Sequence, residues 1–205
     1  MSPVGKDAKT RLLDAAMAMI RAQGYAATSV EDLCRAAGVT KGAFFHHFRS
    51  KEDLAVAAAA HFGAMAAGLF ATAPYHALHD ARGRLLGYVD FRRAILQGEL
   101  PDYTCLLGTL VQEAYASHPA IRAACEAEIT GHAATLEPDI AEALAASGRV
   151  TDWTPTSLAM HIQAVLQGAF VLAKATGGPA VAADSLAHLG RYLAMLFETK
   201  GEARP

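Results

Sequence analysis

The sequence predicts an all-α protein. It is 53% hydrophobic and 19% charged over 205 residues, which is enough apolar material for a sizeable core. Alanine is abundant, leucines are scattered throughout, and runs of β-branched residues are few. This composition favours helix nearly everywhere, because alanine and leucine are strong helix formers.

Three short helices are predicted at the N-terminus. Apolar residues recur at three- and four-residue steps over Lys9–Gln23, as expected for an amphipathic helix. Ser29 is placed to cap a second helix, Val30–Ala37, and Thr40 is placed to cap a third that runs through Phe48. Three closely spaced helix starts predict a compact unit.

Longer helices are predicted beyond Ser50, which is placed as another N-cap. Prolines punctuate this part of the chain, several of them near expected helix starts. Pro138 is a point at which the fourth of these helices can break. The expected helices cover residues 51–72, 76–98, 104–117, 120–147, 155–176 and 180–199.

The charge, the cysteine content and the N-terminal residues indicate which kinds of partner and which cellular compartment to expect. Residues 1–55 carry eight Lys/Arg against six Asp/Glu, so this part is mildly basic, which is only a weak sign of an anionic partner. The three cysteines form no CxxC pair, a pattern typical of a reducing cytoplasm. The N-terminus lacks the apolar region of a signal peptide, and the alanine-rich stretch 55–73 favours a buried helix over a membrane span. We therefore expect a cytoplasmic protein without membrane association.

The sequence contains no recognisable catalytic or metal-binding motif. Its serines show no G-x-S-x-G elbow, and no glycine pattern of a Rossmann or P-loop site is present. His76 and His79 have a spacing that would suit two ligands on one helical face, but no third ligand follows at a recognisable distance. We expect no enzymatic activity, no catalytic residues, no metal and no cofactor. An all-α carrier or enzyme remains the less favoured alternative.

Residues 30–48 have the shape of a helix-turn-helix. Their apolar residues fall on one stripe, formed by Leu33, Ala37, Val39, Phe44 and Phe48. The opposite face carries Lys41, Gly42, Phe45, His46 and Arg49, with His47 at its flank. Cationic, imidazole and aromatic groups beside a glycine suit the DNA major groove, although a solvated helix explains the same spacing.

Three sequence motifs in and around this helix-turn-helix distinguish it from other helical pairs. "GYAATS" begins at Gly24, "AGVTKG" follows at Ala37, and "HFRSKEDL" begins at His47. With these motifs, residues 10–62 resemble the N-terminal domain of the tetracycline-repressor (TetR) family of bacterial transcriptional regulators. The resemblance covers about a quarter of the chain and implies a three-helix DNA-binding domain over residues 1–55. It implies a helical effector-binding and dimerisation domain over residues 56–205.

The resemblance also implies which residues meet DNA. At the start of the second helix, Thr28 and Ser29 are expected to contact DNA phosphates. The residues expected to enter the major groove are Thr40, Lys41, Gly42, Phe45 and His46. On the far side, His47 and Lys51 are expected to bind the DNA backbone. Position 45 is usually tyrosine in the family, so Phe45 lacks a hydroxyl–phosphate bond worth about 0.5–1.5 kcal/mol.

Dimerisation and effector binding are expected in the C-terminal part. The helices at 155–176 and 180–199 are apolar around most of their circumference and carry small residues, which suits either close intramolecular packing or a dimer interface. In the family, such helices form a four-helix bundle with their copies in the second subunit, and a ligand pocket lies between them and the DNA-binding domain. Aromatic and polar residues among apolar runs are the pocket candidates: Phe62, Tyr88, Phe91, Tyr103, Leu110, Glu113, His132 and Gln167.

These expectations combine into a dimeric, sequence-specific regulator of double-stranded operator DNA. Release by a small-molecule effector, and hence repression, is the favoured mode of action. The alternative is a repressor that senses oxidants or electrophiles through Cys105. This residue lies near a helix N-terminus in a C-L-L-G stretch that resembles one group of these repressors. Burial of Cys105 as a small hydrophobic side chain fits the same position.

Overall fold

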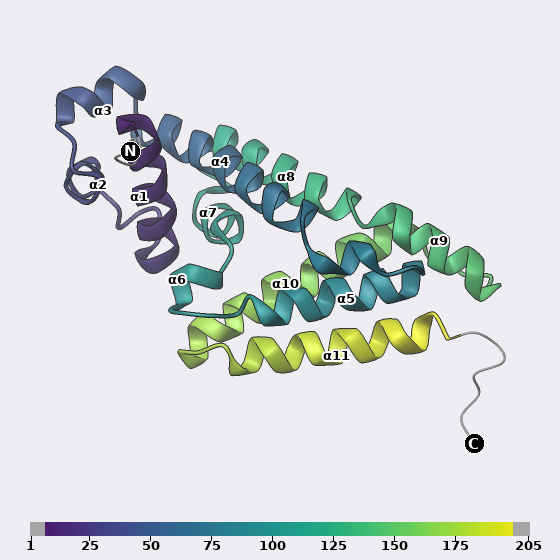
Figure 1. Ribbon diagram of the computed structural model, residues 1–205. Coiled ribbons are helices and arrows are strands. Elements are labelled where there is room, and N and C mark those ends of the chain that lie inside the picture. The colour runs from purple at the N-terminus through teal and green to yellow at the C-terminus, as the bar shows by residue number, and fades with distance from the viewer. Residues whose placement is uncertain (1–6, 199–205) are drawn as a thin grey trace, which may run out of the picture. The chain divides into compact units, whose positions relative to one another are not determined.

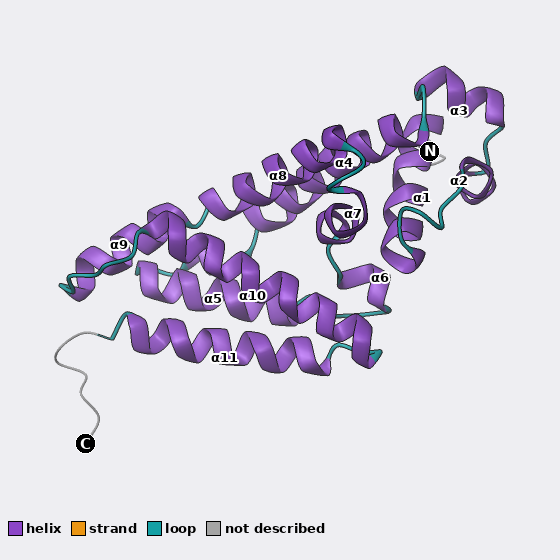
Figure 2. Cartoon of the chain, turned by 180° about the vertical axis from the view of Figure 1, so that it is seen from behind, coloured by secondary structure: helices purple, strands orange, loops and turns teal. Residues whose placement is uncertain are grey.

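The computed structural model describes residues 7–198, and all the regular structure within that range is helical (Figures 1 and 2). This confirms the all-α prediction. The elements are α1 Ala8–Gln23, α2 Val30–Ala37, α3 Lys41–His47, α4 Lys51–Ala71, the 3₁₀ helix η1 Pro74–Ala77, α5 Ala81–Ala94, α6 Leu100–Tyr103, α7 Leu106–Ala114, α8 Pro119–Ala134, α9 Glu137–Ser147, α10 Pro155–Thr176 and α11 Ala180–Leu196.

The described residues form two compact units. The first contains residues 7–66 and 104–128, and the second contains residues 67–103 and 129–198. Helix α4 contributes to both units, which divide within it between Ala66 and Ala67. The functional division at residue 55 stays a prediction, since compactness alone does not test it.

In the first unit, α1 packs against α2, α3 and α7. Leu12, Leu33 and Phe44 from three different helices are fully buried together with the rest of this core. Phe48 is 4% exposed, so both aromatic rings assigned to the apolar stripe lie inside as predicted. The seven-residue α3 is too short to be stable alone. The two buried rings hold it in place, since burial of one phenylalanine side chain contributes about 1.5–3 kcal/mol to stability.

Polar caps define where these short helices begin. The hydroxyl oxygens of Ser29 and Thr40 accept hydrogen bonds of 3.1 Å from the backbone N–H groups three residues on, and that of Ser50 accepts one of 3.0 Å. The three predicted N-caps are therefore confirmed. Between α2 and α3, Gly38 adopts φ 61° and ψ 43°, a left-handed conformation in which a glycine avoids the Cβ penalty.

In the second unit, α5 packs against η1, α9 and α11, and α10 packs against α9 and α11. Figure 1 shows α10 and α11 running side by side. An ion-pair network joins α5 to α9: the Arg84 guanidinium donates to Asp139 at 2.8 Å and to Glu142 at 2.6 Å. Arg84 is only 16% exposed, so this network is better shielded from solvent than a surface pair.

Two expected helices of the C-terminal part differ in the structure, and a third is divided at the proline where a break was expected. The predicted helix at 76–98 is wrong in extent: η1 ends at Ala77, and α5 begins only after Asp80, whose carboxylate accepts a hydrogen bond from the Gly83 N–H at 2.7 Å. This cap starts a new helix, which ends at Ala94. Pro138 lies at the start of α9, and the predicted segment 120–147 is divided there into α8 and α9, which is the break expected at this proline. The segment expected at 104–117 is helical only over α7, Leu106–Ala114.

Two segments of the described chain, Lys51–Ala77 and Pro155–Thr176, are long and apolar enough to cross a membrane by length and composition. Core helices of water-soluble proteins meet the same criterion, so this is weak evidence for a span. The first segment contains the stretch 55–73, which was expected to form a buried helix; in the single chain most of its residues are exposed or half-buried, so this expectation is wrong.

Candidate functional site

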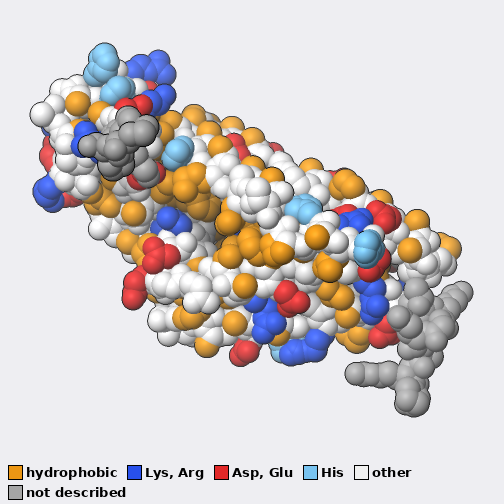
Figure 3. Space-filling view, viewed as in Figure 1, with side chains coloured by type: hydrophobic (Ala, Val, Ile, Leu, Met, Phe, Trp, Pro, Cys, Tyr) orange, Lys and Arg blue, Asp and Glu red, His pale blue; other side chains and the backbone are white. Residues whose placement is uncertain are grey.

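The exposed face of α3 carries the groups expected to enter the major groove. Thr40, Lys41, Gly42, Phe45 and His46 are all exposed, and the Phe45 ring is 51% exposed. Phe44, next to it in sequence, is fully buried and contacts the Phe45 ring edge-on at 5.1 Å between centroids. Figure 3 shows histidine and cationic side chains gathered over this end of the first unit.

Lys41 is held in place by an ion pair with Glu31 of α2. Hydrogen bonding to the Glu31 carboxylate raises the pKa of Lys41, and the same bond lowers the pKa of Glu31. Both side chains are more than half exposed, so solvent screens this pair and a phosphate can compete for the ammonium group.

The residues preceding α2 have internal roles. The Thr28 side chain is 1% exposed, and its hydroxyl donates to the Gly24 carbonyl at 2.7 Å. The Ser29 hydroxyl donates to Asp32 at 2.6 Å, and this bond is the main reason why the pKa of the Asp32 carboxyl is lowered. A phosphate contact from either hydroxyl would have to compete with these bonds and stays a prediction.

Lys51 anchors the loop between α1 and α2. Its ammonium group donates 3.0 Å hydrogen bonds to the carbonyl oxygens of Tyr25 and Thr28 and lies 4.2 Å from the centroid of the Tyr25 ring. An ammonium group has three donors, so one remains for a phosphate. His47 is half-buried at the end of α3, with its ring 4.9 Å from that of His46.

The predicted pocket residues fall into two groups. Phe62, Leu110 and Glu113 belong to the first unit. Leu110 is fully buried, and Phe62 lies 5.7 Å from the Arg21 guanidinium. Glu113 is exposed, and its carboxylate accepts a hydrogen bond from the Ala26 N–H at 2.9 Å, so this residue holds the loop before α2. Its role in a pocket stays a prediction.

In the second unit, the structure brings three pocket candidates together. Tyr88 and Phe91 of α5 and His132 of α8 lie around one aromatic cluster: the Tyr88 hydroxyl is 3.1 Å from His132 Nε2. Three residues that the sequence analysis missed complete it. We call the set the Arg92 cluster; its members are Phe70, Tyr75, Tyr88, Phe91, Arg92 and His132.

Arg92 connects the polar groups of this cluster. Its Nε donates to the Tyr88 hydroxyl at 3.0 Å, and its Nη2 lies 2.7 Å from His132 Nε2. Burial and the neighbouring guanidinium lower the pKa of His132 to about 4, so its imidazole is neutral at pH 7 and accepts the hydrogen bond from Arg92. Burial also raises the pKa of Tyr75 to about 12. The i, i+4 spacing of Tyr88 and Arg92 was the sequence signal for this contact.

Tyr103 and Gln167 also belong to the second unit and are half-buried. The Tyr103 hydroxyl is a buried atom without a hydrogen-bond partner among residues 7–198, and so is the side-chain nitrogen of Gln163, which the sequence analysis did not single out. Buried polar atoms without partners are costly, so both positions would gain from a polar ligand group.

Cys105 is the N-cap of α7, and the Gly108 N–H points to its sulfur at 3.5 Å. The side chain is half-buried, whereas Cys125 of α8 is fully buried. Burial is the main cause that raises the pKa of the Cys125 thiol to about 12. The part of the chain that the structure describes contains no group of three or more His, Cys, Asp or Glu residues able to hold a metal ion.

Comparison with known families gives two matches. Residues 12–58 match the profile described as "Bacterial regulatory proteins, tetR family", and residues 81–189 match "Tetracyclin repressor-like, C-terminal domain". The first match covers α2 and α3 with most of α1 and the start of α4. The second covers more than half of the chain and includes four of the six residues of the Arg92 cluster outright, namely Tyr88, Phe91, Arg92 and His132.

Curated relatives match over the N-terminal region. The chain is 39% identical over 49 residues to the HTH-type transcriptional regulator AcrR of Shigella flexneri, a match that spans 24% of this chain and 23% of that protein. It is 44% identical over 46 residues to the HTH-type transcriptional repressor KstR2 of Rhodococcus jostii, spanning 22% of each. The matched region thus covers less than a quarter of these relatives.

Solved structures match over nearly the whole chain. The regulatory protein TetR from Rhodobacter sphaeroides has a TM-score of 0.79 at 25% identity, covering 90% of this chain and 98% of that one. The reduced form of E. coli NemR has a TM-score of 0.76 at 23% identity, covering 90% and 95%.

Proposed function

Because this chain belongs to the tetR family of bacterial regulatory proteins, and is therefore a helix-turn-helix transcriptional regulator, we propose that it is a dimeric repressor released from its operator by a small-molecule effector. The observation that carries the proposal is the division of α3 into two faces. Phe44 and the adjacent Phe48 anchor the helix, while a cation, an imidazole, a ring and a glycine are left exposed. The relatives are regulators rather than enzymes, and we propose no catalytic activity and a cytoplasmic location, where the DNA is.

We assign the DNA contacts according to these faces. The exposed residues Thr40, Lys41, Gly42, Phe45 and His46 enter the major groove. Ser29 and Thr28 lie at the start of α2, where helix N–H groups attract a phosphate. His47 and the remaining donor of Lys51 bind the backbone. In this proposal residues 1–55 are the DNA-binding domain, and residues 56–205 bind the effector and dimerise.

The dimer interface is proposed on α10 and α11. One small DNA-binding domain makes few phosphate contacts, so operator recognition needs two of them on successive turns of DNA. Both helices expose large apolar side chains in the single chain: Met160, Val171, Leu172, Tyr192 and Met195. The ring of Tyr192 contacts His161 edge-on at 5.6 Å, which links the two helices on that surface. A second copy would cover this apolar surface.

The proposal is tested by fluorescence anisotropy with the DNA that flanks the gene, against scrambled DNA at several salt concentrations. Selective binding with a steep salt dependence is expected. His46→Ala should lose affinity by roughly 5-fold or more, because a specific contact to a base edge is worth about 1–3 kcal/mol. His79→Ala, an exposed histidine outside α3, is the matched control and should bind as the unmodified protein does. Equal binding by both variants would contradict the assigned face, and the absence of selective binding in a randomised-DNA selection would contradict the repressor proposal.

A second candidate function is sensing of oxidants or electrophiles at Cys105. The Gly108 N–H points to the Cys105 sulfur at 3.5 Å, and this side chain is only half-buried, so a small oxidant can reach it. Treatment with hydrogen peroxide should then reduce operator affinity, and Cys105→Ser should abolish this response without changing the affinity of the reduced protein. An unchanged response in Cys105→Ser would exclude this route.

A further inference from the structure

Arg92 is a partly buried cation without a carboxylate partner. Its guanidinium carbon lies 4.1 Å from the centroid of the Phe70 ring and 5.3 Å from that of Tyr88. Its two hydrogen-bond partners are the Tyr88 hydroxyl and the neutral His132 imidazole. None of the ion pairs found between residues 7 and 198 includes Arg92.

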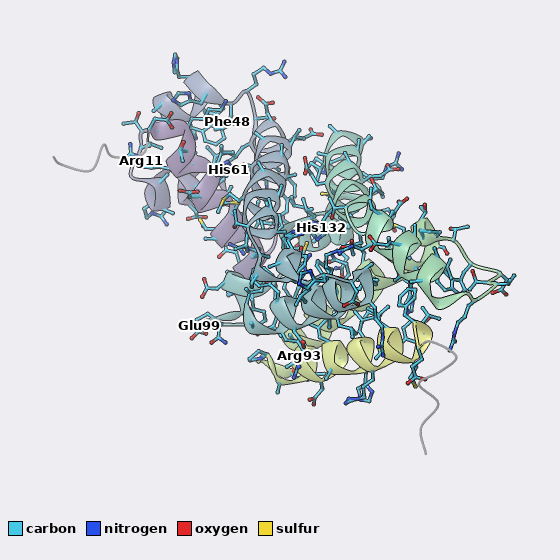
Figure 4. All side chains as sticks on the ribbon, turned by 45° about the vertical axis from the view of Figure 1, so that its right-hand side comes forward. Arg11, Phe48, His61, Arg93, Glu99 and His132 are labelled. Atoms are coloured by element: carbon cyan, nitrogen blue, oxygen red, sulfur yellow. The ribbon has the colours of Figure 1, made fainter. Side chains whose placement is uncertain are left out.

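Three acidic residues of α5 and α9, namely Asp90, Asp139 and Glu142, are paired with other arginines. Asp139 of α9 accepts a hydrogen bond from Arg84 at 2.8 Å. On α5 itself, Asp90 lies 3.4 Å from Arg93, which is exposed and lies apart from His132 in Figure 4. The positive charge of Arg92 is therefore balanced by aromatic faces alone, and these compensate a cation only weakly compared with a carboxylate.

The guanidinium also has donors to spare. It carries five N–H donors, of which one is bonded to Tyr88 and one to His132. The remaining three include both donors of Nη1, and none of them meets an acceptor among the described residues. Arg92, Phe91 and His132 each keep partial exposure, so a molecule from solvent can reach this side of the cluster.

We propose that the Arg92 cluster binds the carboxylate of a small ligand whose remaining part is aromatic or aliphatic. This inference rests on the proposed function and names the chemical class of its effector. The carboxylate accepts hydrogen bonds from Nη1 and Nη2 of Arg92, and the apolar part packs against Phe91 and the Phe70 ring behind it. A singly charged carboxylate matches the single positive charge of Arg92, whereas a doubly charged phosphate would leave a negative charge against aromatic rings.

His132 and Tyr88 act as positioning residues in this site. Their hydrogen bonds hold the guanidinium plane, and its stacking on Phe70 fixes the direction in which the free donors point. Preorganised donors of this kind lose little conformational entropy when the ligand binds.

The experiment measures binding of benzoate, phenylacetate and octanoate to the full chain by isothermal titration calorimetry, each beside its neutral amide. The acid and amide of each pair have nearly the same shape, so their difference isolates the charge. The carboxylates are expected to bind saturably, and the amides roughly 10- to 100-fold more weakly, the range expected for losing hydrogen bonds to a charged group. Arg92→Gln should weaken carboxylate binding by a similar factor, and Arg93→Gln, the neighbouring paired arginine, should leave it unchanged.

Several outcomes would overturn the proposal. These are no binding by any of the three carboxylates, equal binding by acids and amides, or equal losses in Arg92→Gln and Arg93→Gln. Should Arg92→Gln fail to fold, judged by its circular dichroism, Arg92→Lys keeps the charge and replaces the planar group; it should retain the fold and bind carboxylates more weakly than the unmodified protein.

Operator binding is measured separately on the same samples, so that the two proposals can fail independently. Selective DNA binding without carboxylate binding would contradict the ligand class alone. Carboxylate binding through Arg92 that leaves operator affinity unchanged would support the site and contradict its role in release from DNA. Loss of operator affinity on adding benzoate, abolished in Arg92→Gln, would support both.

Discussion

The carboxylate of Glu113, near the end of α7, accepts a 2.9 Å hydrogen bond from the backbone N–H of Ala26, in the loop that leads into α2. Gly24 makes room for it, because a Cβ at that position would collide with the carboxylate. On the same loop, the Tyr25 ring is contacted edge-on by His118 at 5.3 Å. The segment that follows α7 and the start of the helix-turn-helix are therefore joined by side chains.

Glu113→Ala should lower the free energy of unfolding by about 1 kcal/mol, because it leaves the Ala26 N–H without its charged acceptor at an exposed site. Glu113→Gln keeps an acceptor oxygen and should cost less. Urea unfolding followed by circular dichroism measures both. If the two variants are as stable as the unmodified protein, the bond seen here contributes nothing to the fold.

Acid should destabilise the second unit through His132. The pKa of this imidazole is lowered from 6.5 to about 4 in the folded chain, so below pH 6.5 the unfolded chain takes up a proton that the folded chain does not. Stability should therefore fall between pH 6.5 and about pH 4, by up to about 3 kcal/mol at 1.36 kcal/mol per pKa unit. Unfolding of His132→Gln over the same pH range should show a shallower loss; parallel curves would contradict this assignment.

Substitution by alanine at two glycines should change the stability of the chain in opposite directions. Gly38 ends α2 in the left-handed conformation, so Gly38→Ala should destabilise the chain by about 1–2 kcal/mol. Gly68 lies within α4, and a Cβ there would meet nothing within 4 Å, so Gly68→Ala should stabilise by about 0.5–1 kcal/mol. Thermal melting of the pair checks both, and a stabilising Gly38→Ala would mean that the turn is not as described.

Phe45→Tyr should strengthen DNA binding. The ring is exposed at the edge of α3, so the added hydroxyl changes no core packing and can bond a phosphate, a gain of about 0.5–1.5 kcal/mol, or roughly 2- to 10-fold in affinity. Anisotropy titration of the two proteins with the same operator measures the change. If the melting temperature of Phe45→Tyr stays constant, the substitution acts on DNA binding and not on stability. If the DNA affinity is also unaltered, position 45 does not contact the DNA backbone.

The sequence predicted the N-terminal helices closely because their ends are set locally. Ser29, Thr40 and Ser50 each bond a backbone group three residues away, and such short-range chemistry is visible in the residue order. The region 76–98 was predicted less well, because an apolar periodicity continues past Asp80 and hides the new helix start there. The cap that starts α5 is itself local, since the Asp80 carboxylate bonds the Gly83 N–H three residues on, but the periodicity on either side of it masks this signal.

The Arg92 cluster, too, could be predicted from the sequence only in part. Tyr88, Phe91 and His132 could be named singly, as rings and an imidazole among apolar runs. Arg92 was passed over because an arginine on a helix is ordinarily a solvated side chain, and Phe70 because a phenylalanine is ordinarily core. Only the three-dimensional contact of α5 with α8 and the end of α4 gives these residues a common surface.

The two-faced character of α3 has a consequence for how regulators of this kind diverge. The buried rings of Phe44 and Phe48 anchor this helix in the core, whereas Gly42, Phe45 and His46 are exposed on its outer face. Those positions can change after a gene duplication without loss of folding, so a copy of the protein can acquire a new set of target promoters in a handful of substitutions. The same separation makes the outward positions a practical place to reprogramme promoter choice in the laboratory.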